Sequence, residues 1–414
     1  MVSRVSKAGF TLSSFLTLTT TNPPSKHQIP LDGFYVGNEL IRNVSVVLVT
    51  GASGYVALHC VQQLLEAGYS VRGTVRNIQN QNKIAPLRSL KDASERLELV
   101  EADLERPDDW PTAIQGCSFI LHVASPWPIV ADEHTITVAV EGTLNVLKAA
   151  AKCSGVEKIV MTSSCSAIND GHKNDETVFD ETCWTNLEEK HVENYARSKT
   201  IAERAAWDFW GSLKEDERFE LTVINPTFVT GPVLSDQEHG SATVIGRMMD
   251  IRTFLAAPKI CLGVVDVRDV AKAHVRALDC HQSNGQRVLV SHSAPVWFGD
   301  MTKWLRKEFS SKGFMISRIV TPNWLLKIYA KLNIDEQAKS VLHRVGPELR
   351  FNNQKSVDLF AMTYIHPRES VVDMMTSMIE HKMVKQPTVG CRMRLKPRGS
   401  GSETTEKETP TVAA

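Results

Sequence analysis

A strand, a glycine-rich turn and an amphipathic helix follow one another near the start of the chain, and this succession restricts the fold more than any other feature. Residues 44–50 read VSVVLVT, a β-branched run typical of a buried parallel strand. A glycine turn comes next, and residues 56–68 carry apolar side chains at helical spacing. Residues 70–77 predict a second strand, so this part of the chain forms a βαβ unit.

The same alternation continues along the chain. It predicts strands over residues 97–104, 117–124, 157–164 and 219–226, and helices over residues 135–152 and 193–213. Alternating strands and helices indicate an α/β protein with a Rossmann-type, doubly wound parallel sheet. Beyond residue 227 the alternation loosens, although residues 263–278 have the pattern of a strand entering a helix and residues 286–291 that of another strand.

Composition argues against several classes of protein. Lys+Arg and Asp+Glu both number 47, and no basic stripe is visible, so nucleic-acid binding is not expected. No stretch approaches about 18 consecutive apolar residues, so no membrane-spanning helix is predicted. The eight cysteines are scattered and never spaced C-x-x-C, which argues for free thiols and against a disulfide framework or a metal site.

Residues 1–31 contain no Asp or Glu. They carry Arg4, Lys7 and Lys26 among many Ser and Thr, which is the composition of a transit peptide, but their apolar run is short and broken. We expect a cytoplasmic protein with a disordered leader. Mitochondrial import and a mistaken start site in the gene model are the alternatives.

The glycine turn has the chemistry of a phosphate site. Gly51, Gly54 and Ala57 stand at G-x-x-G-x-x-A spacing, after a strand and at the opening of a helix. Glycine lets the backbone approach a pyrophosphate closely, and the helix N-terminus offers unpaired N–H groups with a partial positive charge. The turn therefore predicts dinucleotide binding; the alternative is a tight turn without a ligand.

The end of the second strand indicates which dinucleotide. NAD binders tend to place an acidic residue there, about 20 residues after the turn, to bind the ribose 2′-hydroxyl. This chain has Arg76 instead, followed by Lys83, and cations at this point suit the 2′-phosphate of NADP(H). Asp103, after the third strand, is a candidate acceptor for the adenine amino group or a cap of the next turn.

Tyr195 and Lys199 form Y-x-x-x-K on a predicted helix, where i and i+4 side chains share one face. An ammonium beside a phenol favours the phenolate and lowers the tyrosine pKa, which makes proton transfer at neutral pH feasible. Ser163 and Ser164 end a strand upstream, at the sheet edge where α/β proteins bind ligands. Such a serine can donate to a substrate oxygen or cap a turn.

Taken together, these motifs resemble the extended short-chain dehydrogenase/reductase superfamily, in particular its dihydroflavonol-reductase-like branch. That branch includes plant flavonoid and cinnamoyl-CoA reductases and yeast methylglyoxal-type ketoreductases. The resemblance covers residues 44–291 and is carried by VTGASGYVA, TVRN, ADL, LHVASP, TSS, YARSK followed by AERAAWDF, NPTFVTGP and DVRDVAKAH.

The resemblance implies roles for particular residues. Those expected to bind NADP(H) are Gly51, Ser53, Gly54, Tyr55, Val56, Ala57, Arg76, Lys83, Asp103, Leu104, Ala124, Tyr195, Lys199, Pro226 and Val229. Ser164, Tyr195 and Lys199 match the catalytic trio. His122 and Asn145 are interpreted as structural.

These motifs predict that the chain is divided into four parts. Residues 1–43 are expected to be a disordered leader and residues 44–226 the NAD(P)-binding Rossmann domain. Residues 227–382 are expected to form a smaller C-terminal lobe on the substrate side, interleaved with the sheet. Residues 383–414, basic and then rich in Gly, Ser, Thr and Glu, predict a disordered tail.

The expected function is NADPH-dependent reduction of small aldehydes or ketones, reversible as an alcohol dehydrogenase. Alternatives on this scaffold are a hydroxysteroid dehydrogenase, a sugar-nucleotide epimerase or dehydratase, and a non-catalytic dinucleotide sensor. Flavonoid reductases carry Asn or Asp where this chain has Ile168, which argues against flavonoids. Cinnamoyl-CoA reductases carry a different run at residues 194–199, which argues against a CoA thioester. The physiological substrate and the oligomeric state stay open.

Overall fold

The computed structural model describes residues 45–126, 131–172, 177–324 and 344–387. The expected leader, 1–43, lies outside these ranges, as does most of the expected tail.

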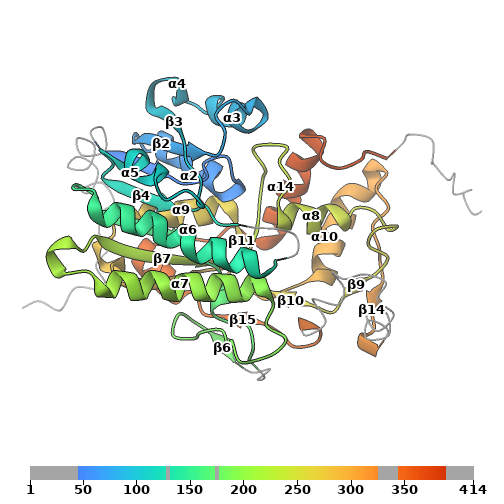
Figure 1. The fold of residues 1–414 in the computed structure, drawn as a ribbon. Coiled ribbons are helices and arrows are strands. Elements are labelled where there is room, and N and C mark those ends of the chain that lie inside the picture. Colours follow the sequence, from blue (N-terminus) through green and yellow to red (C-terminus); the bar gives the residue numbers. More distant parts are fainter. Residues whose placement is uncertain (1–44, 127–130, 173–176, 325–343, 388–414) are drawn as a thin grey trace, which may run out of the picture.

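A parallel sheet forms the centre of the molecule (Figure 1). Its strands are β1 (Val46–Val49), β2 (Ser70–Val75), β3 (Leu97–Glu101), β4 (Phe119–His122), β5 (Lys158–Thr162), β7 (Glu220–Pro226) and β12 (Gln286–Val290). They lie in the order β12-β7-β5-β4-β1-β2-β3, and every neighbouring pair is parallel. The Rossmann-type prediction is therefore confirmed.

Helices cover both faces of this sheet because successive strand residues point to opposite sides. Val47 and Val49 pack with α2 (Tyr55–Glu66) and α9 (Val267–Asp279), whereas Leu48 packs on the other face. That second face is covered by α5 (Asp109–Ile114), α6 (Glu133–Lys152) and α7 (Asn194–Ser212). Between β2 and β3 lie α3 (Gln81–Arg88) and α4 (Ala93–Arg96), and α13 (Gln354–Phe360) contacts α9.

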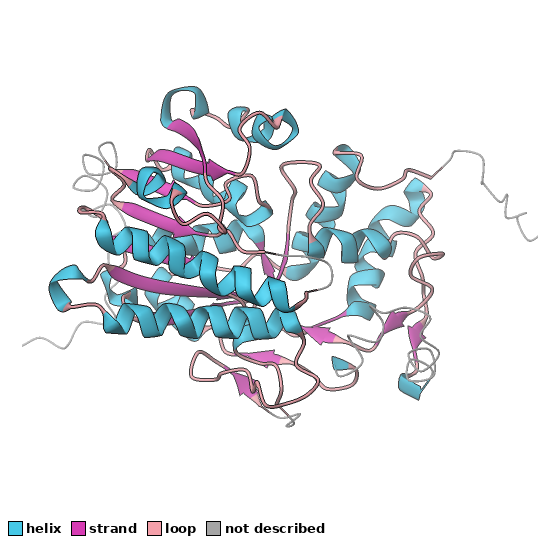
Figure 2. Ribbon diagram, viewed as in Figure 1, coloured by secondary structure: helices cyan, strands magenta, loops and turns pink. Residues whose placement is uncertain are grey.

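A second, mostly helical lobe lies beside the carboxyl edge of the sheet (Figure 2). It contains α8 (Gly240–Arg247), α10 (Phe298–Phe309) and α14 (Pro367–Glu380), which share an apolar core of their own. Four short strand pairs lie outside the main sheet: β8 (Phe228–Thr230) with β11 (Val264–Asp266), β10 (Cys261–Leu262) with β13 (Val296–Trp297), β9 (Ala257–Pro258) with β14 (Val320–Thr321), and β6 (Val178–Phe179) with β15 (Arg350–Phe351). Single 3-10 turns occupy Cys165–Ala167, Glu215–Glu217, His281–Ser283 and Ser310–Lys312.

The chain after residue 226 contributes to both parts of the molecule. Strand β12 extends the sheet beside β7, and α9 packs on α2, whereas α8, α10 and α14 build the lobe. Met383 and Val384 pack against the lobe core, so the packed chain continues past residue 382, where the tail was expected to begin.

The strand order reverses between β1 and β4. The chain runs from β1 through β2 to β3 on one side and from β4 through β5 to β7 on the other. In open α/β sheets, ligands bind at the carboxyl edge beside such a reversal. Within the described ranges, no helix is both long enough and apolar enough to span a bilayer, and all seven cysteines are free thiols.

Candidate active site

One cavity of about 1790 Å³ runs along the carboxyl edge of the sheet and under the lobe. Every residue predicted to bind cofactor or take part in catalysis lines it. These residues are Gly51, Ser53, Gly54, Tyr55, Val56, Ala57, Arg76, Lys83, Asp103, Leu104, Ala124, Ser164, Tyr195, Lys199, Pro226 and Val229. They come from seven separate parts of the sequence, and the parallel sheet brings them together because it aligns the carboxyl ends of its strands.

The glycine turn after β1 is built for close approach. Gly51 has φ +62°, and a Cβ there would lie 3.0 Å from the Cβ of Ala124, so only glycine fits without strain. The Gly51 amide donates to Thr74 Oγ1 at 2.9 Å. Thr50 Oγ1 accepts from the Ala124 amide at 2.9 Å, which fixes the turn against the end of β4.

The first turn of α2 is suited to an anion. No side chain caps it, and none of its residues is acidic. The unpaired N–H groups of a helix start carry a partial positive charge that favours phosphate. Because the turn opens into the cavity, this helix end fits the pyrophosphate of a dinucleotide.

The far end of the cavity carries the expected cations. Arg76 directly follows β2, and Lys83 lies on α3. Asp103 Oδ1 accepts from the Glu105 amide at 3.1 Å, so this carboxylate caps its own turn while it lines the cavity. Trp110 also lines the cavity, and its buried Nε1 has no partner among the described residues, a polar group that sequence reasoning missed.

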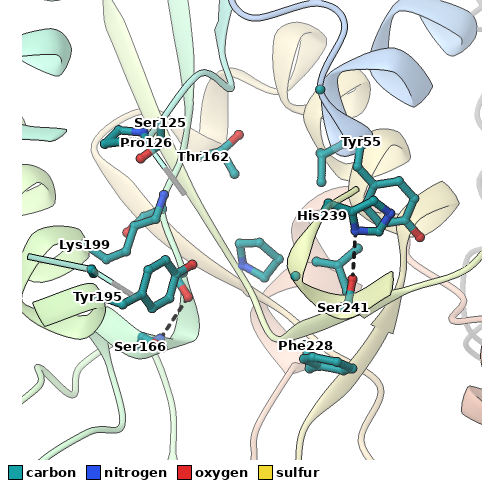
Figure 3. A pocket seen from close by; sticks show the side chains of 18 of the residues that line it. Tyr55, Ser125, Pro126, Thr162, Ser166, Tyr195, Lys199, Phe228, His239 and Ser241 are labelled. Atoms are coloured by element: carbon teal, nitrogen blue, oxygen red, sulfur yellow. Dashed lines mark hydrogen bonds between the residues drawn. The ribbon is translucent and has the colours of Figure 1, made fainter. Parts of the chain in front are cut away.

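Helix α7 places the tyrosine and the lysine side by side on the cavity wall (Figure 3). The Lys199 ammonium lies 5.9 Å from the centre of the Tyr195 ring. Burial lowers the pKa of Lys199 to about 8, and the carboxylate of Glu203 acts in the opposite direction. Ser164 is buried at the end of β5, where its Oγ accepts from the Ser166 amide at 3.1 Å. It therefore caps the 3-10 turn, and its hydroxyl hydrogen is available to another acceptor.

Tyr55 and His239 line the opposite wall of the cavity (Figure 3). Their rings stack with centroids 3.8 Å apart, and the Tyr55 hydroxyl donates to the Gly231 carbonyl at 2.8 Å. Burial lowers the pKa of His239 to about 4, so the ring is neutral at pH 7. Its buried Nε2 has no partner in the described part of the chain. His239 carries no sequence signal, because it lies in a loop that matches no motif.

The residue after Ile168 faces the cavity, and Ile168 itself does not. Ile168 is fully buried in an apolar cluster beneath the cavity wall. Asn169 lines the cavity, and its buried Oδ1 has no described partner. Ile168 therefore gives no evidence against a flavonoid substrate, and Asn169 is the side chain in this segment that a substrate could meet.

Only part of the segment 194–199 lines the cavity. Ala196, Arg197 and Ser198 face away from the cavity, which only Asn194, Tyr195 and Lys199 of that run line. Arg197, for example, donates to the Val192 carbonyl at 3.0 Å. Differences at these three positions say little about the substrate.

His122 and Asn145 make contacts that fit the structural role expected of them. His122 Nδ1 lies 3.0 Å from Thr50 Oγ1, beneath the glycine turn. Asn145 Nδ2 donates to the Leu104 carbonyl at 2.9 Å. In the described ranges, no three His, Cys, Asp or Glu side chains gather as a metal ion would require.

Comparison with known proteins agrees with this geometry. Residues 47–290 match the NAD dependent epimerase/dehydratase family. The chain belongs to this family. The resemblance inferred from the motifs is thereby confirmed.

Among curated relatives of this family member, cinnamoyl-CoA reductase 1 of Petunia hybrida is 39% identical over 278 residues, covering 65% of this chain and 79% of the relative. Tetraketide alpha-pyrone reductase 1 of Arabidopsis thaliana is 35% identical over 252 residues, covering 59% and 76%.

Solved structures give the same picture. Gre2 from Candida albicans in complex with NADPH is 28% identical with a TM-score of 0.67, and the match covers 81% of this chain and 99% of that one. Yeast methylglyoxal/isovaleraldehyde reductase Gre2 complexed with NADPH is 26% identical with the same TM-score and coverage.

Proposed function

We propose that this protein is an NADPH-dependent oxidoreductase that reduces aldehydes or ketones reversibly, with Ser164, Tyr195 and Lys199 as its catalytic trio. One observation carries the proposal. The Tyr195–Lys199 pair on α7 lines the same cavity as the glycine turn, so a dinucleotide held at the turn and a carbonyl compound beside the tyrosine would share one enclosed space.

The lining fits NADPH from end to end. The uncapped start of α2 suits the pyrophosphate, and Arg76 with Lys83 suits a 2′-phosphate. Solved relatives that bind NADPH support this choice of cofactor. The same cations weigh against a sugar-nucleotide epimerase, because such enzymes generally hold NAD.

The chain's own residues account for proton transfer. When bound, NADPH supplies a hydride to the carbonyl carbon. Tyr195 donates its phenol proton to the carbonyl oxygen, and Ser164 orients that oxygen with a hydrogen bond. The Lys199 ammonium stabilises the phenolate that Tyr195 leaves behind. In the reverse direction the phenolate accepts the alcohol proton.

The lobe side of the cavity combines an apolar strip with polar side chains. The strip comprises Phe228, Val233, Leu234, Ile260, Leu262 and Phe298, and the polar side chains include Gln237, Glu238 and Arg247. An apolar strip beside polar groups can bury the hydrocarbon part of a small compound while the polar groups orient it. This lining suits branched aliphatic and aromatic carbonyl compounds.

The test is NADPH oxidation against isovaleraldehyde, methylglyoxal, cinnamaldehyde, cinnamoyl-CoA, a steroid ketone and a sugar nucleotide. Tyr195→Phe should lower kcat by a factor of about 100 or more, because it removes the general acid. NADPH affinity, measured by fluorescence titration, should stay near that of the wild type.

Tyr364→Phe is the matched control. The Tyr364 hydroxyl lies 2.6 Å from Ser356 Oγ, away from the cavity lining, and its loss should leave kcat unchanged. A kcat for Tyr195→Phe close to that of the wild type would disprove the assigned acid. NADPH binding without turnover of any compound in the panel would favour the dinucleotide-sensor alternative.

A further inference from the structure

Behind the proposed trio lies a buried carboxylate that the mechanism above does not use. Glu203 is on α7, one turn beyond Lys199, and is fully buried. It accepts from Ser163 Oγ at 2.5 Å, from Asn225 Nδ2 at 2.8 Å and from Arg287 Nε at 2.5 Å. An isolated buried carboxylate is costly, but this one is paired with a cation and hydrogen-bonded on both oxygens.

Arg287 holds this carboxylate from strand β12. Its guanidinium also donates to the carbonyls of Glu181, Cys183 and Ala167, and it lies 3.6 Å from the centre of the Trp184 ring. The N–H groups of the guanidinium are thus all occupied by hydrogen bonds. The ion pair is a rigid unit and not a mobile surface bridge.

Two contacts connect this pair to the trio. Asn225 Nδ2, which donates to Glu203, also donates to the Ser164 carbonyl at 3.2 Å. Ser163, the neighbour of Ser164, donates directly to Glu203. The end of β5 that carries the catalytic serine is therefore bound to the helix that carries Tyr195 and Lys199.

Among the residues that the structure describes, few charged or titratable groups lie near Lys199. On α7 it faces Glu203 and Tyr195, and on β4 it faces His122. Burial lowers the pKa of His122 to about 3, so that ring is neutral at pH 7. Glu203 is therefore the anion that favours the ammonium form of Lys199, and Arg287 holds Glu203 in place.

We propose that the buried Glu203–Arg287 pair is a positioning device of the active site, which keeps Lys199 charged and fixes Ser164 relative to Tyr195. This inference rests on the proposed function. It assigns Glu203 and Arg287 no contact with substrate; they act through Lys199 and Ser164.

The test is Glu203→Gln, which keeps the shape and removes the charge. Without the anion the pKa of Lys199 falls, so the ammonium is lost at lower pH. The alkaline limb of kcat/KM for isovaleraldehyde reduction should move down by about one pH unit, the smaller end of what one neighbouring charge causes. NADPH affinity against pH, followed by fluorescence, should show the same displacement without any substrate.

The matched control is Glu220→Gln. Glu220 pairs with the buried Lys158 at 3.1 Å, and these residues begin the same two strands, β7 and β5, whose other ends carry Asn225 and Ser164. Glu220→Gln should lower stability but leave the alkaline limb of kcat/KM and the pH dependence of NADPH affinity unchanged. The proposal would be overturned if Glu203→Gln left these two pH profiles unchanged, or if Glu203→Gln and Glu220→Gln shifted them equally.

If Glu203→Gln fails to fold because Arg287 is left unpaired, the double variant Glu203→Gln/Arg287→Met removes both charges. Replacing a buried ion pair by neutral groups is often tolerated. The limbs should still move down, because the carboxylate of Glu203 is the charge that raises the pKa of Lys199. Limbs at the wild-type pH in this variant would refute the role. The NADPH titration separates this outcome from failure of the proposed reductase activity, since it needs no carbonyl compound.

Discussion

Substitution of Arg76 by alanine tests the proposed cofactor most directly. Arg76 lies at the end of β2 and lines the cavity beside Lys83, but its side chain is exposed to solvent. A guanidinium can meet a 2′-phosphate with two parallel hydrogen bonds, whereas the 2′-hydroxyl of NADH offers no such charge.

The solvent exposure of Arg76 determines how much NADPH affinity the substitution should cost. A charged hydrogen bond contributes about 1.5–3 kcal/mol, and solvent screening at an exposed site moves the value toward the lower end. At about 1.4 kcal/mol per tenfold change, Arg76→Ala should weaken NADPH binding about tenfold at physiological salt. The loss should approach about 100-fold at low ionic strength, because screening is weaker there.

Fluorescence titrations with NADPH and NADH, each at low and high salt, measure this directly. NADH affinity should be nearly unchanged in Arg76→Ala. Arg88→Ala is the matched control, since Arg88 is an exposed arginine on α3 that does not line the cavity. Wild-type protein that binds NADH as tightly as NADPH, or an equal loss for both cofactors in Arg76→Ala, would refute the 2′-phosphate assignment.

Two further predictions concern the fold around the site. Gly73→Ala should lower the free energy of unfolding, measured in urea, by about 1–3 kcal/mol and should weaken NADPH binding. The reason is that the new Cβ would lie 2.8 Å from the Cβ of Ala52 in the glycine turn. Gly211→Ala is the control, since the space there is open and the free energy of unfolding should not fall. Burial lowers the pKa of His274 to about 4 in the folded protein. Between about pH 6.5 and 4 this ring is therefore protonated in the unfolded chain but not in the folded one. The free energy of unfolding consequently falls as the pH drops through that range. His274→Gln should therefore flatten the fall of unfolding free energy with acid, and an unchanged slope would show that this ring does not drive it.

The sheet and the glycine turn could be predicted because their signals are local. Strand β1 and helix α2 follow one another in sequence, and a βα turn that needs φ +62° at Gly51 selects glycine directly. The Y-x-x-x-K spacing likewise places two side chains on one helix face without any knowledge of the fold. Parallel alignment then brings separate strand ends to one edge, so each local prediction lands in the same cavity.

The substrate residues could not be predicted by the same means. After β5 ends at Thr162, the chain turns through the 3-10 segment Cys165–Ala167, which breaks the strand alternation. Counting along the sequence therefore selected Ile168, which points into the core, instead of Asn169, which lines the cavity. The lobe is harder still to predict, because pairs such as β9 with β14 join segments far apart in the chain.

Helix α7 shows what a sequence signal for the positioning pair would look like. Tyr195, Lys199 and Glu203 recur at intervals of four, so they form one polar stripe, and the structure turns that stripe inward. On most surface helices a stripe of charged residues faces water. Here the flanking buried positions are small, among them Ala196 and Ala206, which allows the backbone of α7 to approach α6 closely. In this chain, a charged stripe flanked by alanines therefore belongs to a buried polar network and not to the solvent-facing side of the helix. Arg287, 84 positions further along the chain, could be recognised as its partner only once β12 was placed in the sheet.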